Sequence, residues 1–137
     1  MLVENVRCIN IHPGLNPFNR GWFPQVFSII NKKPVGATIH LMDKKVDHGD
    51  ILYQQEVEVF PWDTSKTVYA RVLETEYALF KKNLQCLITG NYSNFEMPDK
   101  DNYNSISDYK NLLEIDLDKT LTMREAIDYL RAMTHPP

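Results

Sequence analysis

Short apolar segments that alternate with helical segments constrain the fold of this chain more than any other feature. Strand-like composition occurs at 6–11, 37–42 and 51–59, and helical character occurs at 25–30 and from Asp63 to Gly90. Strands that alternate with helices predict an α/β fold. The strands 6–11 and 37–42, joined through a helix, resemble one βαβ step, in which two parallel strands belong to a sheet covered on both faces.

The small number of strands indicates that the fold continues outside this chain. Two or three strands cannot form a covered parallel sheet. No glycine-rich loop of the G-x-G-x-x-G or Walker type is present, although such loops occur in the first βα units of nucleotide-using α/β enzymes. We therefore expect the C-terminal part of a Rossmann-like fold with a mixed sheet, truncated at its N-terminus.

The longest predicted helix follows the third strand. Asp63, Thr64 and Ser65 are candidates for its N-cap, and Gly90 stands where a C-terminal cap is common. Between them, apolar residues recur at mostly helical intervals: Val68, Val72, Leu79, Leu84, Leu87 and Ile88. We expect one long helix that closes a catalytic core of residues 1–90.

Residues 91–137 form a C-terminal extension in this interpretation. Residues 91–111 contain several asparagines and turn-forming residues with little periodicity, which predicts irregular structure. The stretch Thr122-Met-Arg-Glu125 is a capping box that starts a second helix. In that helix Met123, Ile127 and Leu130 share one face.

Charge and composition favour small-molecule partners. Fifteen Lys plus Arg stand against eighteen Asp plus Glu, a net charge of −3 without a long basic run, so neither DNA nor RNA is an expected partner. No stretch is apolar enough to predict a membrane span. Cys8 and Cys86 lie in apolar surroundings, which suits buried thiols in a reducing cytoplasm better than a disulfide. We expect a cytoplasmic protein.

Asn10 and His12 are the first candidates for chemistry. Two positions apart in an extended segment, their side chains leave the same face, and they do so at the carboxyl end of a strand. An amide beside an imidazole supplies an oxyanion stabiliser and an acid or base. Asp47, in the loop after the next strand, could return to bond the imidazole. No Ser or Cys nucleophile accompanies them, so direct attack of an amine on a carbonyl is the natural reaction.

Other interpretations of these residues stay open. Asn-x-His-Pro could be a polar turn, and Asp47 could be an ordinary loop residue. His40, in the middle of a strand, is interpreted as structural, and His48 and His135 as solvated. A metal site would need His12, His40, Asp43, Asp47, His48 and Asp50 to converge, but their spacing fits neither an EF-hand nor a zinc motif. We therefore predict no metal, and a metal-dependent hydrolase is the weakest hypothesis.

The segments "NIHPGLNPFNRGWFPQVFSIIN" and "GATIHLMDKKVDHGDIL" together resemble the formyltransferase family that uses 10-formyltetrahydrofolate. The resemblance implies that Asn10, His12 and Asp47 are catalytic. His12 would be the base for the attacking amine, Asn10 the oxyanion partner and Asp47 the partner of the imidazole. It also implies that the loop from Met42 to Asp47 faces the pterin, mainly through its backbone, with Met42, Asp43, Lys44 and Asp47 as folate contacts.

Within this family the loop Gly14-Leu-Asn-Pro17 departs from the Ser-Leu-Leu-Pro form of enzymes that act on methionyl-tRNA and glycinamide ribonucleotide. The segment "NPFNRGWFPQVFSIIN", with "WDTS" at 62–65 and "LRAMTHPP" at 130–137, is most similar to N-formyltransferases of dTDP-amino-dideoxy sugars, especially those acting on dTDP-4-amino-4,6-dideoxyglucose. That resemblance implies a role in surface glycan (O-antigen) synthesis and a possible homodimer. By the same resemblance Arg20, Trp22 and Phe23 would border the sugar amine, and Arg131 would lie near the nucleotide.

Two alternatives to this function stay open. The chain could be an inactive fragment or assembly module of such an enzyme, whose exposed sheet edge serves assembly. It could also be a formyltransferase that acts on another amine, such as methionyl-tRNA or glycinamide ribonucleotide.

Overall fold

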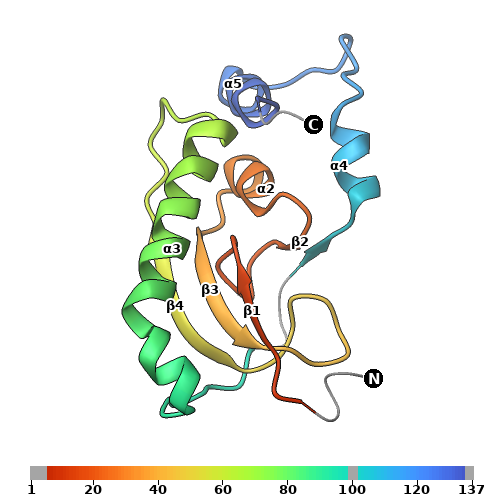
Figure 1. Ribbon diagram of the computed structural model, residues 1–137. Helices are drawn as coiled ribbons and strands as arrows, with labels where there is room; N and C mark the ends of the chain where they lie inside the picture. Colours follow the sequence, from red (N-terminus) through yellow and green to blue (C-terminus); the bar gives the residue numbers. More distant parts are fainter. Residues whose placement is uncertain (1–5, 99–101, 135–137) are drawn as a thin grey trace.

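The computed structural model describes residues 6–98 and 102–134 (Figure 1). His135, interpreted above as solvated, lies outside these residues. The elements are β1 (Ile9–His12), β2 (Arg20–Gly21), α2 (Pro24–Asn31), β3 (Val35–Leu41), β4 (Ile51–Val57), α3 (Ser65–Thr89), β5 (Tyr103–Asn104), α4 (Ile106–Leu112) and α5 (Met123–Ala132). The prediction of an α/β chain with a long central helix is confirmed.

The three main strands form a sheet in the order β1-β3-β4, and both pairings are antiparallel. The predicted parallel βαβ step between the first two strands is therefore wrong. The connection after β1 stays at the end of the sheet where β1 finishes. Two hydrogen bonds fix it there: the Thr38 hydroxyl of β3 donates to Gly14 O (2.7 Å) and accepts from the Asn16 N–H (3.0 Å). With only eight residues, α2 spans about 12 Å. The chain thus enters β3 at the end where it left β1.

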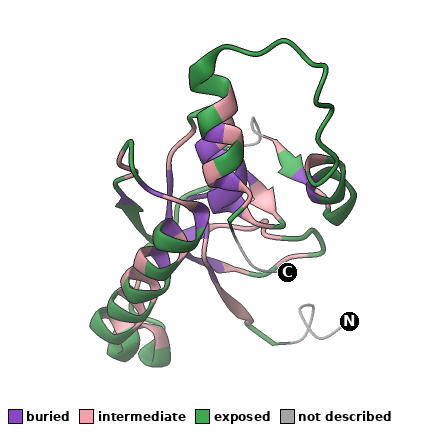
Figure 2. Ribbon diagram, turned by 90° about the horizontal axis from the view of Figure 1, so that it is seen from above, coloured by how far each residue is buried: buried purple, intermediate pink, exposed green. Residues whose placement is uncertain are grey.

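Helix α3 begins and ends where the caps predict. Thr64 and Thr67 form a capping box at its start, and Gly90 adopts the left-handed conformation (φ 73°) at its end. The helix packs against β3 and β4, where Val68 and Val72 are fully buried. Its second half is exposed or half-buried throughout (Figure 2). Ile88, near its end, is 71% exposed.

The core lies between α2, α3 and the sheet. Helix α2 is buried over most of its length, and α5 packs across it. The core cluster consists of Val26, Phe27, Ile29, Val35, Val57, Val68, Val72, Tyr109 and Ala132.

Helix α5 turns its apolar face outward. Met123, Ile127 and Leu130 are 77%, 52% and 62% exposed, whereas Asp128 and Ala132 are buried. The buried carboxylate of Asp128 forms ion pairs with Lys32 and Arg131. Because these ion pairs compensate its burial, the polar side of α5 packs against the core.

The segment predicted to be irregular, 91–111, contains both β5 and α4, so that prediction is wrong in part. Ser105 and Asp108 form a capping box at the start of α4, a local signal that the low periodicity obscured. Strand β5 pairs in parallel with β2, and the side-chain amides of Asn102 and Asn104 donate to Asn19 Oδ1. The extension is thus joined to the loop between β1 and α2 (Figure 1).

Candidate active site

Strand β1 presents Asn10 and His12 on one face of the sheet, as their spacing predicts. In the antiparallel register Asn10 lies opposite His40 of β3, and such directly opposed side chains touch. Asn10 Nδ2 lies 3.2 Å from His40 Nε2, while His40 Nδ1 lies 2.7 Å from Leu41 O. Because a carbonyl can only accept, we assign the proton of His40 to Nδ1, so Nε2 accepts from Asn10.

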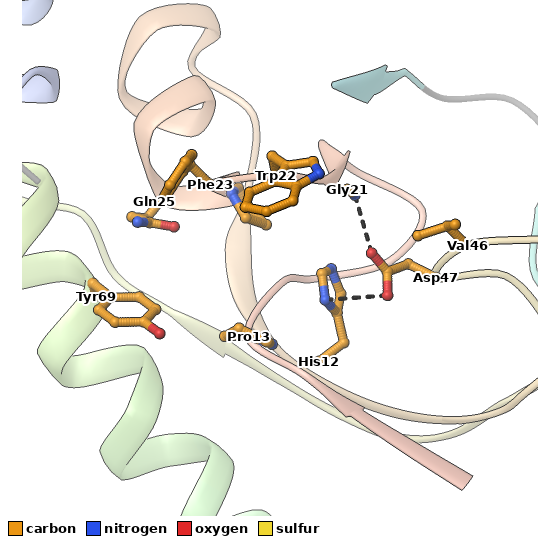
Figure 3. Close-up of a pocket in the computed structure, with 10 residues that line it drawn as sticks. His12, Pro13, Gly21, Trp22, Phe23, Gln25, Val46, Asp47 and Tyr69 are labelled. Carbon is orange, nitrogen blue, oxygen red and sulfur yellow. Dashed lines mark hydrogen bonds and ion pairs between the residues drawn. The ribbon is translucent and has the colours of Figure 1, made fainter. Parts of the chain in front are cut away.

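Asp47 comes to these residues from the loop between β3 and β4. Its Oδ1 accepts from Asn10 Nδ2 (3.2 Å) and lies 3.6 Å from His12 Nδ1, and its Oδ2 accepts from the Gly21 N–H (3.1 Å) (Figure 3). The contact with His12 is slightly longer than a hydrogen bond and is electrostatic in character. The structure therefore brings Asn10, His12 and Asp47 together.

The surroundings of His12 favour its neutral form. The side chain is 5% exposed, and burial lowers the pKa of the imidazole below its usual value. The Asp47 carboxylate acts in the opposite direction, and His40 adds to the lowering. Nε2 of His12 is buried and has no hydrogen-bond partner among the described residues. A neutral imidazole with a vacant Nε2 can accept a proton from a substrate.

The hydrogen bonds of Asn10 restrict what its amide can do. One N–H points to Asp47 and the other to His40. Both amide hydrogens are therefore engaged, and Asn10 can donate to an oxyanion only by sharing or exchanging one of them.

A cavity of about 400 Å³ opens beside these residues (Figure 3). Trp22 and Phe23, predicted to border the acceptor, lie in its wall, and Trp22 is 49% exposed. The full lining is His12, Pro13, Gly21, Trp22, Phe23, Pro24, Gln25, Val46, Asp47 and Tyr69. Gln25 and Tyr69 were not foreseen, because a glutamine in α2 and a tyrosine in α3 carry no local signal that they meet at one site.

Most of the other predicted contacts do not line this cavity. Arg20 lies next to it in β2, half-buried. Of the four predicted folate contacts only Asp47 is in the wall: Met42 and Lys44 are exposed, and Asp43 forms an ion pair with His48.

Arg131 is engaged in holding the helices together. Its Nε donates to Asp128 Oδ1 (2.7 Å), and its Nη1 donates to the carbonyls of Phe60 (3.2 Å) and Asp63 (2.8 Å). It lines a different cavity, beside Lys32 and Arg124. The structure does not bring Arg131 to the cavity at His12.

The described part of the chain holds no group of three or more His, Cys, Asp or Glu side chains placed to bind a metal ion. Within 6–98 and 102–134, no helix has the length and apolar character needed to cross a membrane. Cys8 and Cys86 are free and half-buried, so the expectation that both are buried is wrong.

Two family models match this sequence. The formyl transferase model matches residues 3–84, and the model of the N-formyltransferase dimerization C-terminal domain matches residues 108–137. The first covers both β1 with its Asn-x-His pair and the loop that carries Asp47.

Named proteins resemble the chain over nearly its whole length. The dTDP-4-amino-4,6-dideoxyglucose formyltransferase of Mycobacterium tuberculosis is 42% identical over 134 residues, 98% of this chain and 57% of that protein. A 4-N formyltransferase from Francisella tularensis, known from its crystal structure, is 62% identical with a TM-score of 0.96, over 99% of this chain and 56% of that one. The N-formyltransferase from Helicobacter canadensis, solved with folinic acid and dTDP-3-aminofucose, is 30% identical with a TM-score of 0.82, over 90% and 46%.

The chain thus spans about half the length of these relatives. Over that half, the match of the first family model includes the strand and the loop that supply Asn10, His12 and Asp47. The sequence match and the similarity of fold agree, and this chain belongs to the formyl transferase family.

Proposed function

We propose that this chain carries the catalytic residues of an N-formyltransferase that moves a formyl group from 10-formyltetrahydrofolate to the amine of a dTDP-amino-dideoxy sugar. The most specific acceptor we propose is dTDP-4-amino-4,6-dideoxyglucose, the sugar named for the relative from M. tuberculosis. The observation that carries the proposal is the buried, neutral His12, whose Nδ1 faces Asp47 and whose Nε2 is vacant beside a cavity.

In the proposed reaction the amine nitrogen attacks the formyl carbon, and the bond from that carbon to the folate nitrogen breaks. His12 Nε2 takes a proton from the attacking amine, and this proton then passes to the departing nitrogen. Asp47 orients the imidazole and stabilises its charged form. Asn10 supplies one shared N–H to the oxygen on which charge develops.

The cavity wall suits the two substrates. The ring of Trp22 at the rim can stack on the acceptor, with Phe23 beside it. Val46 and the main chain near Asp47 form the side toward the loop between β3 and β4, where we place the formyl donor. This assignment rests on the resemblance of the loop and on the folate-bound relative from H. canadensis.

The loop Gly14-Leu-Asn-Pro17 favours a sugar acceptor over tRNA, since it differs from the Ser-Leu-Leu-Pro form. The net charge of −3 adds to this preference, because a polyanionic acceptor calls for basic surface. We further place the enzyme in the cytoplasm and its product in the synthesis of a bacterial surface glycan.

We also propose that the protein is a homodimer held together through the C-terminal extension. The matched dimerization domain covers α5, whose Met123, Ile127 and Leu130 form an exposed apolar stripe one to two turns long. Residues at i, i+4 and i+7 of a helix share a face. A two-fold axis would place this stripe against its own copy.

Formyl transfer is tested with 10-formyltetrahydrofolate and dTDP-4-amino-4,6-dideoxyglucose, with the N-formylated sugar nucleotide detected by mass spectrometry. The assay uses the chain alone and a chimera in which it replaces the matching residues of the F. tularensis 4-N formyltransferase. We expect product from the chimera, and its loss in His12→Ala with an unchanged unfolding temperature. A folded chimera that forms no product, or an active His12→Ala variant, would contradict the proposal.

A further inference from the structure

Asp47 has a left-handed backbone conformation, and its main-chain carbonyl is bonded from outside its own loop. Its φ of 47° is one that aspartate adopts more readily than most residues other than glycine, although it still costs free energy. Lys45 and Val46 are exposed, and within the loop the Asp43 carboxylate accepts from the Lys45 N–H (2.8 Å) and pairs with His48. The contacts described above act on the carboxylate of Asp47 and leave its main chain unexplained.

Asn16 makes the contact to that main chain. Its side-chain Nδ2 donates to Asp47 O at 3.1 Å, and the residue is only 2% exposed. Its own backbone is anchored to the sheet, since its N–H donates to Thr38 Oγ1 (3.0 Å) and its carbonyl accepts from Gln54 Nε2 (2.6 Å). Thr38 and Gln54 are paired neighbours in β3 and β4. The Asn16 amide is therefore a donor in a fixed place.

Stability alone does not account for an asparagine at this position. Asn16 Oδ1 is buried and has no hydrogen-bond partner among the described residues. A buried polar atom without a partner is unfavourable, and an apolar side chain of similar volume would avoid that cost. Leucine, which occupies this place in the Ser-Leu-Leu-Pro form, has the same branched shape, with two bulkier methyl groups in place of the amide oxygen and nitrogen.

We propose that Asn16 is a positioning residue: its amide holds the main-chain carbonyl of Asp47 and thereby keeps the carboxylate against Asn10, Gly21 and His12. The importance of this contact for catalysis rests on the proposed function, in which an aligned Asp47 carboxylate orients the catalytic imidazole. The contact itself is testable without any formyl transfer.

The test is a pH titration of His12 by NMR in the chain labelled with ¹³C-histidine, with the His12 signal assigned by its loss in His12→Gln. The Asp47 carboxylate raises the pKa of His12, whereas burial and His40 lower it. In Asn16→Leu the main chain of Asp47 loses this anchor, and the carboxylate, held then only by Asn10 and Gly21, lies less closely at Nδ1. The pKa of His12 therefore falls, and we expect its acid dissociation constant to rise about threefold or more, which is about half a pKa unit. A cooperative thermal unfolding transition checks that the variant is folded.

Two controls separate positioning from a general effect. Asn83→Leu is the matched substitution, since Asn83 Nδ2 also donates to a main-chain carbonyl (Leu79 O, 2.8 Å) but lies in α3. It should leave the titration of His12 unchanged. In an Asp47→Asn background, Asn16→Leu should add no further shift. If Asn16→Leu does not fold, Asn16→Ala removes the same donor and takes its place.

An unchanged pKa of His12 in a folded Asn16 variant overturns the inference. So does a shift that persists in the Asp47→Asn background, because the effect would then not pass through the carboxylate. The expected shift in the chain, together with a folded chimera that transfers no formyl group, would contradict the proposed function and leave this inference standing.

Discussion

His12 is the residue whose protonation state decides the chemistry of the cavity. Burial and the neighbouring His40 favour the neutral ring, and the Asp47 carboxylate only partly offsets them. An imidazole must be neutral to accept a proton. Burial disfavours its charged form and therefore keeps His12 in the state that its proposed role requires.

The lowered pKa of His12 predicts the pH dependence of formyl transfer. Since the ring is neutral above its pKa, the ionisation of His12 should lower kcat/KM in the chimera only below about pH 6.5, the usual imidazole value, once the separately measured titration of the substrate amine is taken into account. Asp47→Asn should reduce the rate and move the limb that is due to His12 to still lower pH, because it removes the charge that raises the pKa. Measured pH–rate profiles check both statements, and an enzyme ionisation above about pH 6.5 in the corrected profile would contradict them.

The residues with reactive side chains could be predicted from the sequence, whereas the residues that hold them in place could not. Asn10, His12 and Asp47 carry functional groups and a recognisable spacing. Asn16 donates to Asp47 through its side-chain amide, and Gly21 donates to it through its backbone N–H. Both lie at least 26 positions from Asp47 in the sequence. Such contacts leave no local pattern.

The pairing of β2 with β5 joins the C-terminal extension to the candidate site. Gly21 is central to it: the residue pairs with Asn104 and donates its N–H to Asp47 Oδ2. Its φ of 91° is left-handed, and a Cβ there would lie 2.4 Å from Asn104 O. Only glycine fits between the two strands.

Gly21→Ala is therefore expected to separate β2 from β5. The left-handed backbone alone costs about 1–2 kcal/mol with a side chain, and the clash adds to this loss. Gly90→Ala is the matched control, because Gly90 is also left-handed (φ 73°) but its Cβ would meet only the flexible end of Arg7. Chemical denaturation should show the larger loss of unfolding free energy for Gly21→Ala. Equal losses would argue against a strained β2–β5 contact.

The start of α3 depends on a buried carboxylate. Asp63 is 3% exposed, accepts from the Phe60 N–H (2.8 Å), and pairs with Arg71. Burial opposes its ionisation, but Arg71, the Phe60 N–H and Thr67 outweigh it, so the pKa of Asp63 is lowered.

Asp63→Asn should reduce the unfolding free energy by about 2 kcal/mol at pH 7, the value of a hydrogen-bonded charged group. Because the folded pKa is lowered, this stabilisation is complete above the unfolded pKa of about 3.9 and is lost as the pH falls through the folded value. The difference between wild type and variant should therefore narrow below pH 4. Denaturation at pH 7 and pH 3 measures it, and a constant difference would exclude the ionised carboxylate as its source.

At the scale of the whole molecule, the outward apolar face of α5 predicts an interface. Ile127→Glu places a charge in the exposed stripe with Met123 and Leu130, and it should convert the proposed dimer to a monomer without lowering the unfolding temperature of the subunit. Light scattering after size exclusion measures the mass. Ile88→Glu, at a more exposed position of α3 (71% against 52% for Ile127), is the control that should stay dimeric. A wild-type chain or chimera that is monomeric at all concentrations would contradict the dimer.

Features with local causes could be predicted from the amino-acid pattern alone. The two-residue spacing on a strand places Asn10 and His12 on one face, and the capping residues Thr64 and Gly90 set the ends of α3. Alternating strand and helix patterns were enough for the α/β class. Each of these signals lies within a few residues of the structure that it specifies.

How these elements meet depends on contacts between residues that are far apart in the sequence. The direction of β3 against β1 depends on where the loop after His12 docks, and a strand pattern is the same for parallel and antiparallel pairing. The two residues of β5 are too short to predict, since their partner in β2 lies 83 positions earlier. The apolar face of α5 points away from the core because Asp128 finds its partners inside. Contacts between distant residues carry no periodicity, so they are settled only when the chain packs.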